Sequence, residues 1–387
     1  MRIGRIIILL SMFISLLSNT EMNASTPQRP DFAYPQTVSA EAGKSLKQAL
    51  AAADGPAILR ALLDYYLAQT SISNENAQPV LNRIDSICTA SADPLLKAML
   101  LTLQADIYSA TYNNSRWKFD SRDLPLTPLP ADINEWSGAQ FRSRISALVS
   151  SALTYGQQLK DVPISTYASV IDLDGNRGSG KSSAITRRMT EMYYPTLYDF
   201  VAGQSLNLLK SNGRIEAMLP WSLLTRHDIY LTLPFSKYDP TVARILEIYA
   251  SLLAFHPKGS APYINTDIER VDFISSHIYT SSDEDMRQLP DRKYALLQSL
   301  YDENIRSEYS GDVLIATPVT ETNRRWLYLS INHNINTFPA YARKNELLNI
   351  RRSLEEQVVT LSYPDVVAPK TEVKLNIKLT NVKSGKI

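Results

Sequence analysis

The sequence is poor in cysteine, in net charge and in long apolar runs. Cys88 is the only cysteine among 387 residues, so no intramolecular disulfide can form and stability must come from packing. We expect Cys88 to be an inert core thiol. The 40 basic residues nearly balance the 39 acidic ones, which leaves no overall field to hold nucleic acid. We therefore expect no nucleic-acid partner.

Patterns typical of catalysis or metal binding are also scarce. The four histidines lack the H-E-x-x-H spacing that puts two imidazoles on one helix face, and no G-x-S-x-G elbow is present. We predict no metal, no cofactor and no enzymatic activity. A carboxylate pair for glycoside hydrolysis stays open, because such residues meet only in the fold.

The amino-terminal segment indicates export. Arg2 and Arg5 precede an apolar run, Ile6–Leu17, and a polar stretch follows up to Ala24, as in a secretory signal peptide. The run falls short of the roughly 20 residues that span a bilayer. We expect residues 1–24 to be cleaved and the mature chain to reach the periplasm or cell envelope of a bacterium. A retained, uncleaved anchor is the alternative.

Helical spacing dominates residues 44–357, after an extended lead at 25–43. Asp54 is placed to cap a helix beginning at Pro56, and Asp93 precedes a second helix in the same way. Later apolar runs repeat the helical spacing at 141–159, 197–209, 242–255, 294–305 and 341–358. Because these runs have no fixed period, we predict a mainly α fold, an irregular array of helical hairpins, with a division into two subdomains near 172–195.

The carboxy-terminal residues 358–387 change to a strand pattern. Apolar residues cluster at Val358–Leu361 and alternate at Glu372–Leu379, with prolines between the two runs. Two short strands cannot bury a sheet face by themselves. We therefore expect these residues to be the first strands of an incomplete, truncated β-sandwich.

One segment satisfies the P-loop pattern G-x-x-x-x-G-K-[ST] in full, through Gly175, Gly180, Lys181 and Ser182. In a P-loop the backbone wraps the phosphates, the lysine reaches the β and γ oxygens and the serine binds Mg²⁺. Such a site needs a parallel sheet, and the surrounding pattern is helical. Tyr167–Leu173 is the one candidate strand before it. We interpret the segment as an ordinary loop rich in glycine and serine, with nucleotide binding as a remote alternative.

The same stretch approaches a calcium-binding loop. Asp172, Asp174 and Asn176 occupy ligand positions one, three and five of an EF-type loop. Arg177 replaces the turn glycine and Ser183 replaces the bidentate glutamate. We therefore predict no calcium site.

Two further segments carry a resemblance to a known family. The first is Tyr112–Arg122 together with Asp132–Trp136, which follows it, and the second is Tyr194–Ala202. Together they resemble the N-terminal helical region of the large alpha-2-macroglobulin-like proteins of Bacteroidetes-type bacteria. The positions that carry it are Arg116, Trp117, Trp136, Pro195, Tyr198 and Asp199. We expect Trp117, Trp136 and Tyr198 to pack between helices, and Arg116 to pair with Asp199.

The resemblance implies endopeptidase inhibition by full-length proteins, which capture proteases through a bait region and, in some members, a Cys-x-Glu-Gln thioester. The segment around Cys88, Ser86–Ala90, does not have that pattern. We therefore expect a scaffold or docking module of a cell-envelope protein, with proteases or other envelope proteins as partners. It would not inhibit by itself, and the strands from Val358 onward would begin a macroglobulin-like β-sandwich.

The alternative is a free-standing exported helical protein that binds glycans or peptides. SusD-like nutrient-binding proteins share the helical hairpins and the aromatic content. They are usually lipid-anchored through a cysteine after the signal peptide, and no cysteine lies near Ala24.

Overall fold

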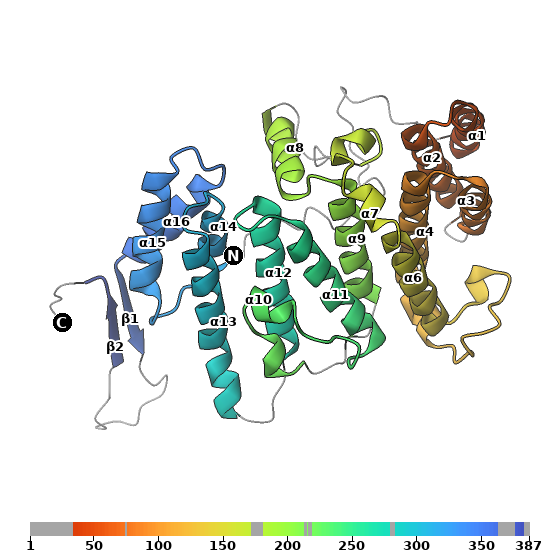
Figure 1. Ribbon diagram of the computed structural model, residues 1–387. Coiled ribbons are helices and arrows are strands. Elements are labelled where there is room, and N and C mark those ends of the chain that lie inside the picture. The colour runs from red at the N-terminus through yellow and green to blue at the C-terminus, as the bar shows by residue number, and fades with distance from the viewer. Residues whose placement is uncertain are drawn as a thin grey trace, which may run out of the picture. The chain divides into compact units, whose positions relative to one another are not determined.

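The computed structural model describes residues 34–73, 76–171, 181–212, 215, 219–278, 283–362 and 376–382 (Figure 1). The fold is mainly α-helical, and a two-stranded antiparallel sheet lies near the carboxy terminus. The predicted fold class is thus confirmed. The predicted signal peptide at 1–24 lies outside the described residues.

The chain divides into two compact units. Unit 1 comprises Met1–Ala217 and Leu233–Phe255, and unit 2 comprises Met218–Thr232 and His256–Ile387. The boundaries differ from the division that we expected near 172–195. The helices on both sides of that range belong to unit 1.

Unit 1 is organised around one long central helix. Its helices of five or more residues are α1 (Pro35–Ala52), α2 (Gly55–Ile72), α3 (Gln78–Ala90), α4 (Pro94–Asn114), α5 (Arg116–Asp120), α6 (Gly138–Leu153), α8 (Lys181–Tyr193), α9 (Leu197–Asn212) and α11 (Pro240–Phe255). Shorter turns are α7 (Gly156–Leu159), η2 (Ile133–Glu135) and η3 (Ile164–Tyr167). Helix α4 packs against α2, α3, α6 and α9, and Figure 1 shows α3 and α6 on its two sides.

Capping residues fix where the first helices begin. Asp54 accepts a hydrogen bond from the Ala57 amide at 3.0 Å, and Asp93 accepts one from the Leu95 amide at 2.9 Å. Both predicted caps are confirmed, and they satisfy amides that have no partner within the helix. The expected extended lead at 25–43 is wrong from Pro35 onward, because this proline occupies the first turn of α1, where its fixed φ angle favours a helix.

Unit 2 is built around the short helix α14. Its helices are α10 (His227–Tyr230), α12 (Ala261–His277), α13 (Asp283–Glu303), α14 (Ser310–Ala316), α15 (Arg324–Thr337), α16 (Lys344–Glu355) and the turn η4 (Trp221–Leu223). Helix α14 packs against α12, α13, α15 and α16. Most of α14 is buried. A Cβ at Gly311 would come within 2.6 Å of the Tyr341 ring.

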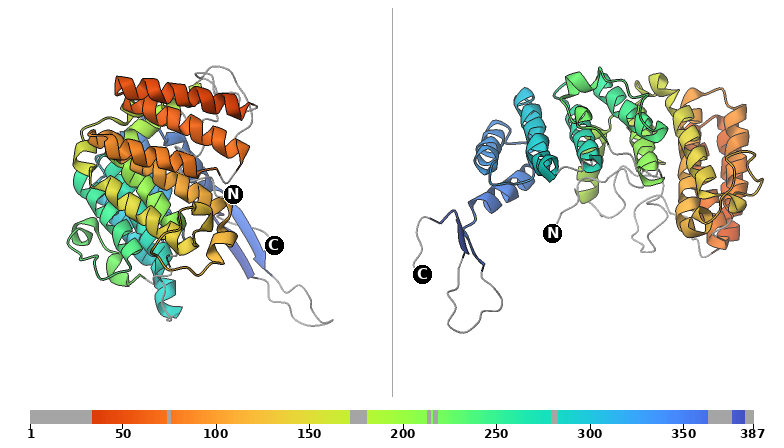
Figure 2. Two further views of the ribbon diagram at one scale, coloured as in Figure 1. Left: turned by 90° about the vertical axis from the view of Figure 1, so that its right-hand side faces the viewer. Right: turned by 90° about the horizontal axis from the view of Figure 1, so that it is seen from below.

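A β-hairpin follows α16. Strands β1 (Val358–Ser362) and β2 (Asn376–Thr380) are antiparallel, and Thr360 lies opposite Lys378. The structure therefore confirms the predicted strand at Val358–Leu361 and, within the second run, a strand from Asn376 onward. Residues 372–375 of that run lie outside the described residues. In the right-hand view of Figure 2, the hairpin, drawn in dark blue, extends away from α16.

Candidate functional site

The hairpin is fixed to the carboxy-terminal end of α16. Asn381, which follows β2, donates from its side-chain amide to the carbonyl oxygens of Leu354 at 2.6 Å and Glu356 at 2.8 Å. Arg324 of α15 donates to the same Leu354 oxygen at 2.8 Å. These bonds satisfy carbonyl groups that the end of a helix leaves without partners. The base of the hairpin is therefore anchored to the end of α16, which Arg324 joins to α15.

One face of the hairpin is apolar and open to solvent. Because side chains alternate along a strand, Val359 and Leu361 share a face with their cross-strand partners Leu379 and Ile377. Val359 and Leu361 are each 57% exposed and Leu379 is 48% exposed. We call these four residues the hairpin face. Thr360 lies on the opposite face.

The first segment of the family resemblance surrounds Asp120. The Asp120 carboxylate accepts from the Tyr112 hydroxyl at 2.8 Å and from Arg142 at 2.9 Å. Arg116 contacts its other oxygen at 3.4 Å. The pKa of Asp120 is lowered, because these hydrogen bonds and the Arg142 charge outweigh its desolvation. Arg116 thus pairs with Asp120, and the expected pairing with Asp199 is wrong.

The two tryptophans of this segment have opposite environments. Trp136 is 4% exposed, stacks on Tyr108 with ring centroids 5.3 Å apart and donates from its indole N–H to the Pro130 carbonyl at 2.8 Å. The prediction of core packing is confirmed for Trp136. Trp117 is 80% exposed, so the same prediction is wrong there. Helix α5 buries Phe119 instead, which leaves the Trp117 side of this single short turn outward.

The second resembling segment starts helix α9. The Asp199 carboxylate accepts from both the amide and the hydroxyl of Thr196, at 2.9 and 2.7 Å, and the Asp199 amide donates back to that hydroxyl at 3.3 Å. This reciprocal arrangement is a capping box. The Pro195 carbonyl accepts from the Ile164 amide at 3.0 Å, which ties the chain just before α9 to the start of η3. Tyr198 is buried, as predicted.

The P-loop pattern has no sheet to support it among the described residues. Gly175 and Gly180 lie outside the described residues, as do Asp172, Asp174 and Asn176 of the calcium pattern and the side chains of Lys181 and Ser182. The preceding strand that we considered is wrong over 167–171, since Tyr167 ends η3 and turns follow. The only sheet in the described part of the chain is the antiparallel hairpin, whereas a P-loop requires a parallel sheet.

The expectation that Cys88 is a core residue holds only in part. The thiol is half-buried on α3. Burial is the main cause that raises its pKa, and the nearby Lys97 charge opposes the rise. A raised pKa disfavours the nucleophilic thiolate.

A polar cluster in unit 2, buried except at Glu303, connects α10, α12 and α13. Tyr263, Asp267 and Arg270 lie on one face of α12, four and three residues apart, and all are buried. Arg270 contacts Asp267 at 2.7 Å. His227 of α10 is also buried: its Nδ1 lies 3.9 Å from Asp267 Oδ2, and its Nε2 lies 3.6 Å from Glu303 Oε2. We call these five residues the polar cluster.

Three buried atoms of the polar cluster have no hydrogen-bond partner among the described residues. They are His227 Nε2, the Tyr263 hydroxyl and Arg270 Nη1. Burial raises the pKa of Tyr263, and the carboxylates of Asp267 and Glu303 raise it further. Buried polar groups normally have hydrogen-bond partners, so three buried atoms without partners in one cluster call for an explanation.

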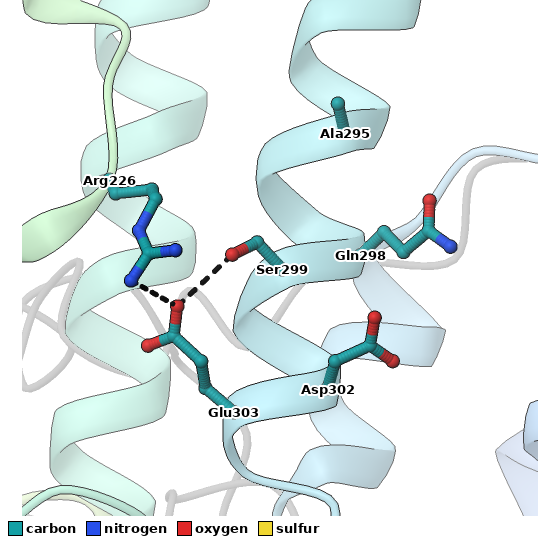
Figure 3. Close-up of a pocket in the computed structure, with 6 residues that line it drawn as sticks. All are labelled: Arg226, Ala295, Gln298, Ser299, Asp302 and Glu303. Carbon is teal, nitrogen blue, oxygen red and sulfur yellow. Dashed lines mark hydrogen bonds and ion pairs between the residues drawn. The ribbon is translucent and has the colours of Figure 1, made fainter.

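An open depression of about 490 Å³ adjoins the polar cluster (Figure 3). It is lined by Arg226 and by Ala295, Gln298, Ser299, Asp302 and Glu303 of α13. Arg226 and the Ser299 hydroxyl each lie 3.0 Å from the same oxygen of Glu303. Glu303 thus belongs to both the depression and the polar cluster. The pKa of Asp302 is raised by burial.

No helix within the described ranges is long and apolar enough to cross a membrane. In the same residues, no three His, Cys, Asp or Glu side chains are grouped so as to hold a metal ion.

No family model, curated protein or solved structure matches this chain. The family resemblance therefore rests on the two segments described above.

Sequence reasoning missed both the polar cluster and the depression. His227 is one of the four histidines without metal-binding spacing, and Glu303 is 76 positions away from it along the chain. The spacing of Tyr263, Asp267 and Arg270 was the available signal, because it places three polar residues on one helix face.

Proposed function

We propose that this chain is the N-terminal scaffold and docking module of an alpha-2-macroglobulin-like protein of the bacterial cell envelope, without enzymatic activity of its own. The hairpin face is the observation that carries this proposal. Its exposed apolar side chains belong to a sheet that needs a covering layer, since a two-stranded sheet is at best marginally stable alone. The proposed covering layer consists of strands of a macroglobulin-like β domain.

The anchoring of the hairpin supports a docking role. Asn381 holds its base through two carbonyl groups at the end of α16, and Lys378 of β2 lies 2.9 Å from Glu321. A surface held in place before binding loses less conformational entropy on binding than a freely moving segment. The helices of unit 2 would thus present the strands in a fixed orientation.

The resembling segments support a scaffold role. The Asp120 contacts tie α4, α5 and α6 together, and the Thr196–Asp199 capping box begins α9. Both arrangements hold helices in place. Protease capture would depend on the full-length protein.

Interface variants in the native host test the docking role. Val359→Lys places a charge on the hairpin face, whereas Thr360→Lys places the same charge on the opposite face of the same strand. After mild cross-linking and purification, macroglobulin-like domains should associate with the parent chain and the Thr360 variant and be lost from the Val359 variant. Equal association in all three would refute the role of the hairpin face.

An inhibition assay tests the claim that this chain does not inhibit proteases without the rest of the proposed protein. The purified chain should leave the cleavage of a protein substrate by an endopeptidase unchanged, even in molar excess. Inhibition that saturates at one chain per protease would show that the chain inhibits by itself, contrary to the proposal.

Glycan or peptide binding is the second candidate, and the depression of unit 2 is the observation that favours it. Its lining of charged, amide and hydroxyl groups can bind polar ligands. None of the six lining residues is aromatic, so none provides a flat face for stacking a sugar ring. Saturable oligosaccharide binding at micromolar concentration would favour this candidate over the scaffold.

Nucleotide binding is the remote third candidate. Measurable nucleotide binding by the purified chain, abolished in Lys181→Ala, would support it.

A further inference from the structure

We propose that an exposed loop of unit 1, rich in leucine and proline, binds the surface of a lipid bilayer with zwitterionic headgroups. The loop is Leu124–Pro130, between α5 and η2, and we call it the leucine loop. Its leucine side chains would enter the interfacial part of the bilayer without crossing it. This surface goes beyond the proposed scaffold function and does not depend on it.

The leucine loop presents apolar side chains to solvent. Leu124, Leu126 and Leu129 are 37%, 54% and 42% exposed, and Thr127 has the only polar side chain of the loop. In Figure 1 the loop belongs to the gold segment beside α6. Single exposed leucines are common, but three within six consecutive residues concentrate apolar surface at one place, which is typical of an interaction site.

Buried side chains of the following segment hold both ends of the leucine loop. The side-chain amide of Gln140 donates to the Pro125 carbonyl at 2.7 Å, and the Trp136 indole N–H donates to the Pro130 carbonyl at 2.8 Å. Both donor residues are buried. The loop is therefore positioned before it meets a partner, which lowers the entropy that it loses on binding.

The backbone of the leucine loop favours lipid over a protein groove. Three of its seven residues are prolines, which have no N–H group, and the carbonyls of Pro125 and Pro130 already accept hydrogen bonds. A protein that binds an extended strand does so largely through such backbone groups. In a bilayer, by contrast, each backbone group without a partner costs free energy. A loop with few free backbone groups therefore suits lipid better.

The charges around the leucine loop indicate which kind of bilayer it suits. No residue from Leu124 to Ala131 is charged, whereas Asp123 and Asp132 flank this run and are both exposed. Arg122, the nearest basic residue along the chain, donates to backbone carbonyl groups within the protein. Anionic lipid would repel the two flanking carboxylates, while choline headgroups carry an outer positive charge that attracts them.

Flotation of the purified full chain with phosphatidylcholine vesicles tests the proposal. The parent chain should float with the vesicles. The double variant Leu126→Ser/Leu129→Ser should bind at least tenfold more weakly, because it has lost two apolar side chains. Leu329→Ser changes a similarly exposed leucine of α15 and should bind like the parent chain. Thermal melting would confirm that the variants are folded.

Tryptophan fluorescence locates the contact independently. Leu126→Trp should add an emission that shifts to the blue with vesicles and is quenched by brominated phosphatidylcholine, measured as the difference from the parent chain. Leu329→Trp is the matched control and should show neither change. Vesicles that also contain phosphatidylglycerol should bind the parent chain no more strongly than phosphatidylcholine alone.

The proposal is overturned by any one of three results. These are no flotation of the parent chain, equal binding by the folded double variant, or stronger binding to vesicles with phosphatidylglycerol. Equal binding by the double variant would place the lipid contact elsewhere on the chain.

A photoreactive residue in place of Leu126 in the native host separates lipid from protein. The proposal predicts cross-linked lipid, and a cross-linked protein in its place would show that the leucine loop docks on a protein. None of these results bears on the association of macroglobulin-like domains with the hairpin face, so failure here is distinguishable from failure of the scaffold proposal.

Discussion

Asn381 caps helix α16 from outside the helix, through a hydrogen bond of 2.6 Å from its side-chain amide to the Leu354 carbonyl. The backbone of Asn381 is left-handed, with φ at 58°, a conformation that asparagine tolerates better than most residues. One residue thus both turns the chain after β2 and joins the hairpin to the helix. We therefore expect Asn381 to restrict the motion of the hairpin relative to α16.

Substitution of Asn381 should loosen the hairpin while the helices stay folded. Asn381→Gly removes the side-chain bonds and keeps the left-handed turn, whereas Asn381→Ala also disfavours the turn, by about 1–2 kcal/mol. Amide hydrogen exchange in β1 and β2 should become faster in the glycine variant and faster still in the alanine variant. Equal exchange in all three proteins would show that the cap does not hold the hairpin.

Asp106 should make the stability of unit 1 depend on pH. Complete burial raises its pKa to about 8, while a hydrogen bond from Gln204 opposes the rise. The folded chain therefore holds a proton between about pH 4 and pH 8 that the unfolded chain has released, and unfolding free energy falls as pH rises, by up to about 1.4 kcal/mol per pH unit.

Asp106→Asn removes that titration. Its stability relative to the parent chain should increase from pH 4 to pH 8, as measured by urea unfolding at several pH values. A constant difference between the two proteins across this range would mean that Asp106 is ionised in the folded state.

The two tryptophans of the resembling segment should respond oppositely to truncation. Trp136→Ala removes a buried ring and should cost about 3–5 kcal/mol, whereas Trp117→Ala should change stability by no more than about 0.5 kcal/mol. Denaturant unfolding of both variants measures the difference. Comparable losses would contradict the exposure of Trp117.

A paired glycine substitution tests the packing around Asp120. A Cβ at Gly138 would overlap the Asp120 carboxylate, so Gly138→Ala should cost about 1–3 kcal/mol. Gly43 lies inside α1 with no atom near its missing Cβ, and Gly43→Ala should stabilise by about 0.5–1 kcal/mol. Thermal melting of the two variants should therefore shift in opposite directions.

Local signals in the sequence predicted the helices well and the environments of single side chains less well. The caps at Asp54 and Asp93 act on amides two or three residues away, so sequence alone identifies them. The outward position of Trp117 depends on which side of a five-residue helix meets α6. The spacing of apolar residues in the sequence does not indicate that side. The sequence predicted the two hairpin strands. The apolar face that they share could be identified only from the register in which they pair.

The polar cluster was beyond prediction for a different reason. His227 and Glu303 come from segments separated by the whole of α11 and α12, and only the fold of unit 2 brings them within 3.6 Å of each other. The P-loop pattern is the opposite case. The local sequence matches in full, but the surrounding elements are helices and provide no parallel sheet for a nucleotide site.

Site-specific cross-linking from the hairpin face tests the central claim most directly. A photoreactive residue replaces Val359 in the native host, and Thr360 on the opposite face of β1 serves as the control position. The account predicts that Val359 cross-links to a β-strand of a macroglobulin-like domain, identified by peptide mass spectrometry, and that Thr360 does not. Equal products from both positions, or a Val359 product in any other kind of segment, would contradict it.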